Sequence, residues 1–390
     1  MGSAPRVQSI PVAGVYISYP FCAQKCTYCN FASGVFPRAL ERRYVDALLR
    51  EIRGFDWGSW AGNALGGTAG LTDESVCPTS LRLPETVYLG GGTPGNMAPD
   101  DLRAVLEAIP GRPWIEATIE AAPGGITGER AGHWIACGIN RVSLGVQSFV
   151  EKEIRRTGRK HTAHTVEREM QLLRAAGIAS INIDLIAGLP GQTEASWRES
   201  LDWIERLAPE HVSVYMLEVD EDSRLGKEML AGGARYGAAE TPDDDRVAAL
   251  YEMAVERLAA LGLHHYEISN FARAGWESRH NLKYWRLEPY AGFGADAHSF
   301  DGKMRRRNAE TVEEYVNGSG QVGDLPHAAE RFFVGLRLME GIRPAADEWQ
   351  RHDAAIRKFL DAGLLETADG VLRLSSRGVL VSNVVLAEFV

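Results

Sequence analysis

The chain has 390 residues, of which 45% are hydrophobic and 24% charged, so it is long enough for one large globular domain and a smaller one. Its net charge of -10 argues against a nucleic-acid-binding protein, which usually carries a basic excess. The sequence shows no signal peptide and no apolar run that could span a bilayer, so we expect a cytoplasmic protein with no transmembrane segment.

Short β-rich runs alternate with amphipathic helical stretches from residue 14 to about residue 216. The expected strands are Val15–Ser18, Thr86–Leu89, Trp114–Glu120, Arg141–Gln147, Ile181–Ile186 and His211–Leu217. The expected helices are Ala39–Arg53, Pro99–Ile109, Thr127–Cys137, Ala163–Ala176 and Thr193–Leu207. Strands that alternate with helices predict an α/β fold around a parallel sheet, either open or closed into a barrel.

The segment 58–84 interrupts this alternation because it is rich in Gly, Ser and Thr. It joins a helix to the next strand, and in parallel α/β folds such connections lie away from the ligand-binding face. We therefore interpret it as a peripheral insertion in which Cys77 has no functional role. Cys137, in an apolar helical stretch, is interpreted as a core residue.

The pattern changes after about residue 300. Three helices are expected, over Glu310–Val316, His327–Met339 and Ala345–Leu360, followed by a hairpin that turns at Asp369-Gly370. This pattern predicts a small C-terminal α/β accessory domain, similar to a winged helix but without a basic helix for DNA. We therefore divide the chain into a tail over 1–13, a main domain over 14–300 and an accessory domain over 301–390.

The most basic stretch runs from Lys303 to Arg307. It is interpreted most simply as a solvated turn. The alternative is a contact for an anionic ligand or a lipid headgroup.

Three of the five cysteines, Cys22, Cys26 and Cys29, lie within eight residues, directly after the first expected strand. An odd, clustered set of cysteines favours metal binding over disulfides. Thiolates are the usual ligands of iron–sulfur clusters, and three of them would leave one iron of a [4Fe–4S] cluster open. A zinc site is the alternative, but no histidine lies in this loop.

The run from Tyr16 to Cys22, with Tyr28 before the third cysteine, resembles the signature of the radical S-adenosylmethionine (SAM) superfamily. It is most similar to the branch of oxygen-independent coproporphyrinogen III dehydrogenases and HemW-type heme chaperones. The resemblance implies a partial (β/α)6 barrel, with the open iron binding the amino and carboxylate groups of SAM.

A glycine run follows the second expected strand, in Gly90-Gly91-Gly92-Thr93-Pro94. Glycines allow backbone to approach a ligand closely, although such a run can also be a flexible turn. The resemblance implies that Gly91, Gly92 and Thr93 contact the amino group of SAM.

Four polar residues, Glu120, Gln147, Arg159 and Asp184, lie in or just after later strands. Polar side chains at strand ends of parallel folds usually face a ligand, although each could instead cap a helix or satisfy loop amides. The resemblance implies that the two carboxylates and Gln147 serve the nucleoside of SAM and that Arg159 pairs with its carboxylate. It also places Tyr16 beside this cofactor.

The run His280-Asn281-Leu282-Lys283-Tyr284-Trp285 resembles the heme-binding signature of the HemW chaperones. Imidazole is a good axial ligand of heme iron, so His280 is the expected ligand. Tyr284 and Trp285 offer flat apolar surface beside it. The alternative is a histidine satisfied by a hydrogen bond to a backbone carbonyl, and His298 is the second candidate ligand.

The resemblance implies a heme chaperone that transfers heme to apo-proteins of respiratory chains, including membrane complexes, with a reductant for the cluster as a further partner. Such a protein would be cytoplasmic, or peripheral at the inner face of the membrane. One alternative is a coproporphyrinogen III dehydrogenase, whose relatives carry a further cysteine where this chain has Phe31 and a longer N-terminal extension. A radical SAM methyltransferase is a second alternative, and a non-catalytic electron-transfer module is a third.

Overall fold

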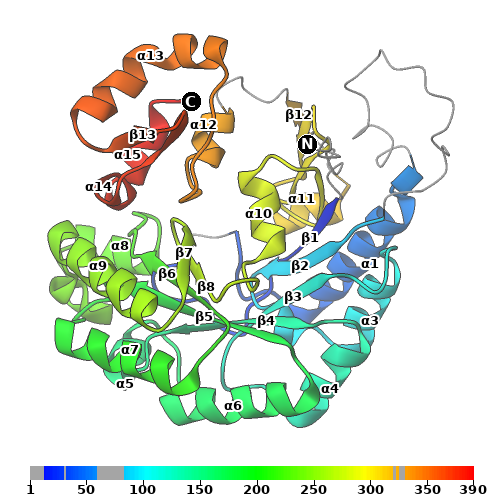
Figure 1. Cartoon of the computed structure of the whole chain (residues 1–390). Helices are drawn as coiled ribbons and strands as arrows, with labels where there is room; N and C mark the ends of the chain where they lie inside the picture. Colours follow the sequence, from blue (N-terminus) through cyan, green and yellow to red (C-terminus); the bar gives the residue numbers. More distant parts are fainter. Residues whose placement is uncertain (1–12, 30–31, 59–82, 319–321, 325–329) are drawn as a thin grey trace, which may run out of the picture.

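The computed structural model describes residues 13–29, 32–58, 83–318, 322–324 and 330–390 (Figure 1). Residues 1–12 of the expected tail, most of the peripheral insertion, Phe31 and Cys77 lie outside these ranges.

Six parallel strands that neighbour one another in chain order form the centre of the molecule. They are β1 (Gly14–Tyr19), β2 (Thr86–Gly91), β3 (Glu116–Ala121), β4 (Arg141–Gln147), β5 (Ser180–Ala187) and β6 (His211–Met216). The helices between them are α1 (Arg38–Gly54), α3 (Pro99–Glu107), α4 (Gly128–Ala136), α5 (Glu151–Arg156), α6 (Ala163–Ala176) and α7 (Glu194–Leu207). These helices cover the outside of the curved sheet, which confirms the expected parallel α/β fold (Figure 1).

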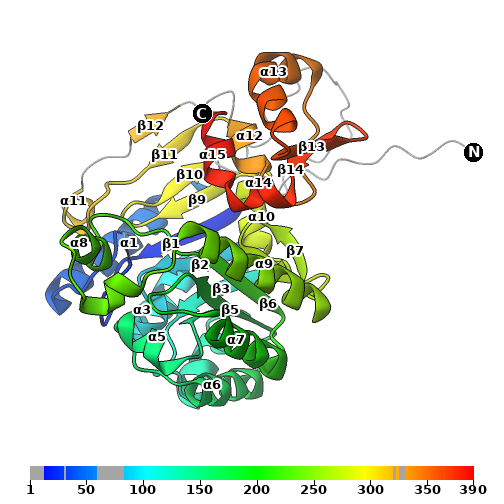
Figure 2. The ribbon, with the colours of Figure 1, turned by 90° about the vertical axis from the view of Figure 1, so that its left-hand side faces the viewer.

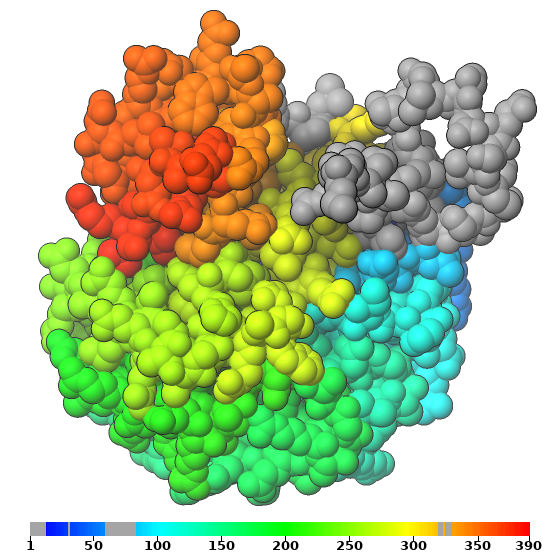
Figure 3. Space-filling view, in the orientation of Figure 1, coloured from blue at the N-terminus to red at the C-terminus, as the bar shows by residue number. Residues whose placement is uncertain are grey.

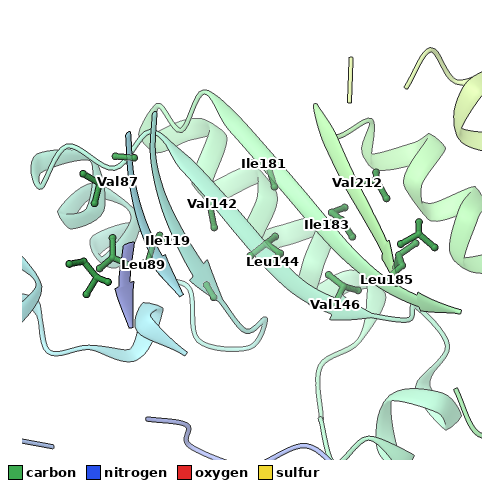
Figure 4. Close-up of a cluster of buried hydrophobic side chains, with 14 of the residues drawn as sticks. Val87, Leu89, Ile119, Val142, Leu144, Val146, Ile181, Ile183, Leu185 and Val212 are labelled. Atoms are coloured by element: carbon green, nitrogen blue, oxygen red, sulfur yellow. The ribbon is translucent and has the colours of Figure 1, made fainter. Parts of the chain in front are cut away.

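The apolar residues of these strands explain why the sheet forms. Val142, Leu144 and Val146 alternate along β4 and are fully buried, as are Ile181, Ile183 and Leu185 on the next strand (Figure 4). Each such side chain contributes about 1.5–3 kcal/mol when it leaves water.

The helix ends follow local sequence signals. Thr162 caps the start of α6 with its side chain, and Gly177 ends this helix in the left-handed conformation, with φ of 99°.

The sheet extends beyond the six strands at both edges. After α8 (Arg224–Leu230), the 3-10 helix η2 (Arg235–Glu240) and α9 (Asp244–Ala260) come β7 (His264–Glu267) and β8 (Asn270–Ala272). Strand β8 pairs antiparallel with β6, and β7 pairs antiparallel with β8 at the edge. Past the helix α10 (Arg279–Trp285), strand β9 (Tyr290–Phe293) returns to lie parallel to β1. Then come β10 (His298–Phe300), β11 (Arg305–Arg307) and β12 (Val322–Asp324), with α11 (Val312–Val316) before the last of them (Figure 2).

Strand β11 corrects the interpretation of the basic run as a turn. Its residues pair with both neighbouring strands, and the Arg305 side chain forms an ion pair with Glu330.

The C-terminal residues form a separate lobe that rests on the barrel (Figure 3). It contains α12 (Glu330–Gly335), α13 (Ala346–Asp361), the hairpin β13 (Leu365–Ala368) and β14 (Val371–Leu374), α14 (Ser376–Leu380) and α15 (Ser382–Ala387). The hairpin turns at Asp369 and Gly370, both with positive φ, as its sequence predicts. Helix α12 ends at Gly335 rather than near Met339, because Leu338 pairs with Glu267 of β7 instead.

Within the described ranges, no helix is long and apolar enough to cross a membrane.

Candidate functional site

The loop with the three clustered cysteines follows β1 at the carboxyl end of the sheet. It is held by backbone hydrogen bonds from Cys22 N to Gly34 O (2.8 Å) and from Thr27 N to Thr157 O (3.2 Å). The Cys22 sulfur accepts a hydrogen bond from the Thr93 hydroxyl (3.8 Å), and the Cys26 sulfur accepts one from Arg159 Nε (3.3 Å).

These donors suit thiolate ligands. Burial raises the pKa of the Cys22 thiol, and the hydrogen bonds from Thr93 and Ser33 act against this rise. Among the residues that the structure describes, no three Cys, His, Asp or Glu side chains are arranged to hold one metal ion. A four-iron cluster takes each thiolate on a different iron, so its ligands need not converge on a point. Three cysteines in one loop, two of whose sulfur atoms accept hydrogen bonds, suit thiolate ligation of such a cluster.

The glycine run packs directly against the cysteine loop. A Cβ atom on Gly92 would lie 2.8 Å from the Phe21 carbonyl oxygen, and Gly91 has a φ of 105°. Thr93 N donates to Phe21 O (3.0 Å). Glycine is therefore required here by close backbone contact, and the run brings Gly91, Gly92 and Thr93 beside the cysteines as expected.

Glu120 and Asp184 lie in the concave face of the sheet. Asp184 accepts hydrogen bonds from Asn182 Nδ2 (2.7 Å) and Ser143 Oγ (3.1 Å), and Glu120 accepts one from the Tyr88 hydroxyl (2.9 Å). Burial, followed by the charge of Asp184, raises the pKa of Glu120 to about 7 from its ordinary 4.5. The structure thus brings the two expected nucleoside ligands close enough to interact electrostatically.

Tyr16 lies on the same face, at the same register as Tyr88, and their ring centroids are 6.2 Å apart. A Cβ atom on Gly90 would come within 3.2 Å of Tyr88, Tyr16 and Glu120. The first glycine of the run, to which the sequence analysis gave no role, therefore makes room for this aromatic and acidic group.

Gln147 and Arg159 meet at the end of β4. Gln147 is buried with a φ of 71°, at a bulge between β4 and β5. Arg159 donates to the Gly145 carbonyl and, as noted, to Cys26. Part of its guanidinium is thus engaged by the protein, and the expected pairing with the carboxylate of SAM would use the remaining N–H groups.

The run that resembles a heme-binding signature forms α10. This helix packs at the amino end of β1, β2 and β3, opposite the end that carries the cysteine loop (Figure 1). It lies about 20 Å from the cysteine loop, because β1 rises ~3.3 Å for each of its residues. Glu116, the first residue of β3, holds the start of α10 by accepting from Arg279 N (2.9 Å), His280 N (3.0 Å) and Ser278 Oγ (3.2 Å).

His280 is fully buried, and both of its ring nitrogens have hydrogen-bond partners. Nδ1 lies 2.9 Å from the Thr86 hydroxyl, and Nε2 lies 2.7 Å from the Tyr284 hydroxyl. Burial, with the charges of Lys283 and Arg141, lowers the pKa of His280 to about 3, so its imidazole is neutral. His280 is thus satisfied within the protein, as in the alternative interpretation, but its partners are two hydroxyls and not the backbone carbonyl expected there. Binding to iron would require Tyr284 to move.

The other motif residues are also packed. Tyr284 lies edge-on against Tyr290, with ring centroids 4.6 Å apart, and the Arg337 guanidinium lies 4.4 Å from the Trp285 ring centre. Arg337 belongs to the C-terminal lobe, so Trp285 lies where the lobe meets α10. His298 is exposed on β10.

A small polar cavity connects the candidate SAM residues with α10. Its lining residues are Tyr88, Glu120, Arg141, Ser143, Asn182, Asp184, Ser213, Tyr215, Asn270 and Asn281. Of these, only Glu120 and Asp184 were predicted from the sequence as site residues. A sequence signal did exist for Tyr88. Side chains alternate along a strand, so Thr86, Tyr88 and Gly90 lie on one face of β2, the same face as Tyr16 on β1.

Comparisons with known proteins agree with this geometry. The model of the radical SAM superfamily matches residues 79–204, and the HemN C-terminal domain matches residues 326–381. The heme chaperone HemW of Mycobacterium tuberculosis is 31% identical over 392 residues, which cover 96% of this chain and 93% of that protein. The heme chaperone HemW of Escherichia coli is 31% identical over 85% of this chain and 84% of its own.

The structure of the coproporphyrinogen III oxidase HemN from Escherichia coli is also similar, with a TM-score of 0.75 and 20% identity over 98% of this chain and 91% of that one. At this identity the likeness concerns the fold.

Proposed function

The chain belongs to the HemW family of the radical SAM superfamily, and we propose from this premise that it is a heme chaperone. The observation that carries the proposal is the 31% identity to a heme chaperone across 96% of the chain, which includes both the cysteine loop and the C-terminal lobe. Its cargo would be heme, and its recipients would be apo-proteins that require heme, including membrane respiratory complexes. It would act in the cytoplasm or at the inner face of the membrane.

The resident cofactors of this proposal are a [4Fe–4S] cluster and SAM. Cys22, Cys26 and Cys29 would hold the cluster, while Thr93 and Arg159 donate hydrogen bonds to two of the three sulfur atoms. The cluster, once loaded and given a reductant, supplies one-electron chemistry.

The residues proposed for SAM surround the open side of this loop. The protein's task here is to bind and orient SAM. Gly91, Gly92 and Thr93 would contact its amino group, and the remaining N–H groups of Arg159 would pair with its carboxylate. The nucleoside would lie toward the residues on the concave face, namely Tyr16, Glu120, Gln147 and Asp184.

His280 is the proposed ligand of heme iron. If its Nδ1 donates to Thr86, the lone pair lies on Nε2, where the Tyr284 hydroxyl now donates. Metal-bound histidines commonly keep such a donor contact through the other nitrogen. Tyr284 would therefore act as a gate, and heme binding would begin when it leaves Nε2, with Trp285 adding apolar contact.

The test is a hemin titration of anaerobically reconstituted protein, followed by transfer to an apo-protein and by an assay for coproporphyrinogen III turnover. The proposal expects a Soret band and heme transfer, with no turnover. His280→Ala should weaken the band, while His298→Ala, an exposed control, should retain it.

Tyr284→Phe gives an independent measurement, because it removes the hydrogen bond at Nε2 without deleting the ligand. The net value of such a bond is about 1 kcal/mol, so hemin binding should tighten about fivefold. Robust conversion of coproporphyrinogen III to protoporphyrinogen IX would favour the dehydrogenase instead and would refute the chaperone proposal.

A further inference from the structure

One side chain, Tyr88, touches both candidate sites. Its hydroxyl donates to Glu120 Oε1 (2.9 Å), and its ring stacks on the His280 ring, with centroids 5.3 Å apart and planes 26° apart. Tyr88 lies in the middle of β2, between the cysteine end and the end that carries α10. The carboxylate proposed for the nucleoside and the histidine proposed for heme are therefore separated by a single side chain.

The surroundings of Tyr88 favour one position of its ring. Gly90 leaves the space in which Tyr88, Tyr16 and Glu120 meet, and Gly14 leaves the space for His280, whose ring lies 3.1 Å from where a Cβ atom on Gly14 would be. A shift of the Tyr88 ring would thus displace the His280 ring, because close-packed interiors transmit displacement.

A second path links the same two regions. Asn182 donates to Asp184, and its Oδ1 lies 2.7 Å from His211 Nδ1. His211 Nε2 lies 2.8 Å from the Tyr266 hydroxyl, which also accepts from Ser278 N at the start of α10. This chain of hydrogen bonds and Glu116 both hold the start of α10 independently of Tyr88, so a change at Tyr88 alone should leave the helix folded.

We propose that Tyr88 couples the SAM site to the heme-binding helix, so that bound SAM holds His280 in its closed position; this rests on the function proposed above. Ribose hydroxyls that engage Glu120 would fix its carboxylate, and the fixed carboxylate would fix the Tyr88 hydroxyl and hence the ring over His280. Coupling between two ligands is reciprocal, so heme and SAM should each weaken the binding of the other. Bound SAM would then keep His280 closed to heme.

The test compares wild-type protein with Tyr88→Phe, which keeps the ring on His280 and removes only the contact with Glu120. Amide hydrogen exchange of residues 279–285 is measured on the reconstituted full chain, with and without SAM. Titration of the reduced cluster by paramagnetic resonance verifies that SAM is bound. Couplings of this kind are typically 5–150-fold, and we expect SAM to slow exchange in α10 about tenfold in the wild type and not at all in Tyr88→Phe.

A matched control is Tyr251→Phe, since Tyr251 is a buried tyrosine whose hydroxyl contacts the Ile268 carbonyl and touches neither site. It should retain the wild-type response to SAM. An effect of SAM that persists in Tyr88→Phe, or exchange in wild-type α10 that does not respond to SAM, would overturn the coupling.

Hemin titrations with and without SAM provide the second measurement, in which SAM should weaken hemin binding in the wild type only. A chain that binds no hemin refutes the chaperone function, whereas the exchange experiment still decides whether Tyr88 links the two regions. The two failures are therefore distinguishable.

Discussion

The carboxylate of Glu116 should determine how firmly α10 is held. It is buried, with 6% of its surface exposed, and accepts three hydrogen bonds from the start of this helix. Glu116→Ala would leave two helix N–H groups without their acceptor in a buried place. A hydrogen bond to a charged group is worth about 1.5–3 kcal/mol, and losses at one carboxylate are not additive. We therefore expect a loss of about 3 kcal/mol in the free energy that keeps α10 closed.

Hydrogen exchange with mass spectrometry measures this directly. A loss of about 3 kcal/mol corresponds to exchange about 150-fold faster in residues 279–285, since 1.4 kcal/mol is a factor of ten. Glu116→Gln keeps one acceptor oxygen and should give a smaller increase, which also provides a result if the alanine variant folds poorly. Glu129→Ala, which removes an exposed glutamate from the first turn of α4, is the control. Unchanged exchange in both Glu116 variants would show that the cap does not hold the helix.

Three further predictions concern the other end of the barrel. Replacing any one of the three clustered cysteines by Ala should abolish iron incorporation after anaerobic reconstitution, whereas Cys137→Ala should retain it; iron content and visible absorption measure both. Arg159→Ala should weaken the response of the reduced cluster to SAM at least tenfold, because a charged hydrogen bond of about 1.5–3 kcal/mol is lost, while Arg159→Lys should recover part of it. Glu120 should contribute stability at pH 4.5 that is lost as pH rises through about 7, because its pKa is higher in the folded state, and the difference of about 2.5 in pKa corresponds to about 3 kcal/mol. The free energy of unfolding of Glu120→Gln, measured relative to wild type, should therefore rise by about 3 kcal/mol between pH 4.5 and 7, and a difference that does not change with pH would contradict the assignment.

The strands and helices of the barrel could be predicted from the sequence because their signals are local. Buried runs such as Arg141–Gln147 and helical periods such as Ala163–Ala176 coincide with β4 and α6. The Asp369-Gly370 turn is likewise encoded by residues that tolerate positive φ. The spacing of the cysteines and the position of polar residues at strand ends are local signals, since parallel strands bring their carboxyl ends together, while the assignment of these residues to SAM came from the family resemblance.

Tertiary contacts decided which distant strands pair and which partners the buried polar side chains have. Strand β9 pairs with β1 although some 270 residues separate them, and Arg305–Arg307 became a strand only because β10 and β12 flank it. The sequence presented His280 as a candidate iron ligand, but packing of α10 against β2 gave both of its nitrogens hydroxyl partners and removed it from solvent. The bridge formed by Tyr88 arises in the same way, because a contact between distant segments depends on how the sheet curves and what packs into it.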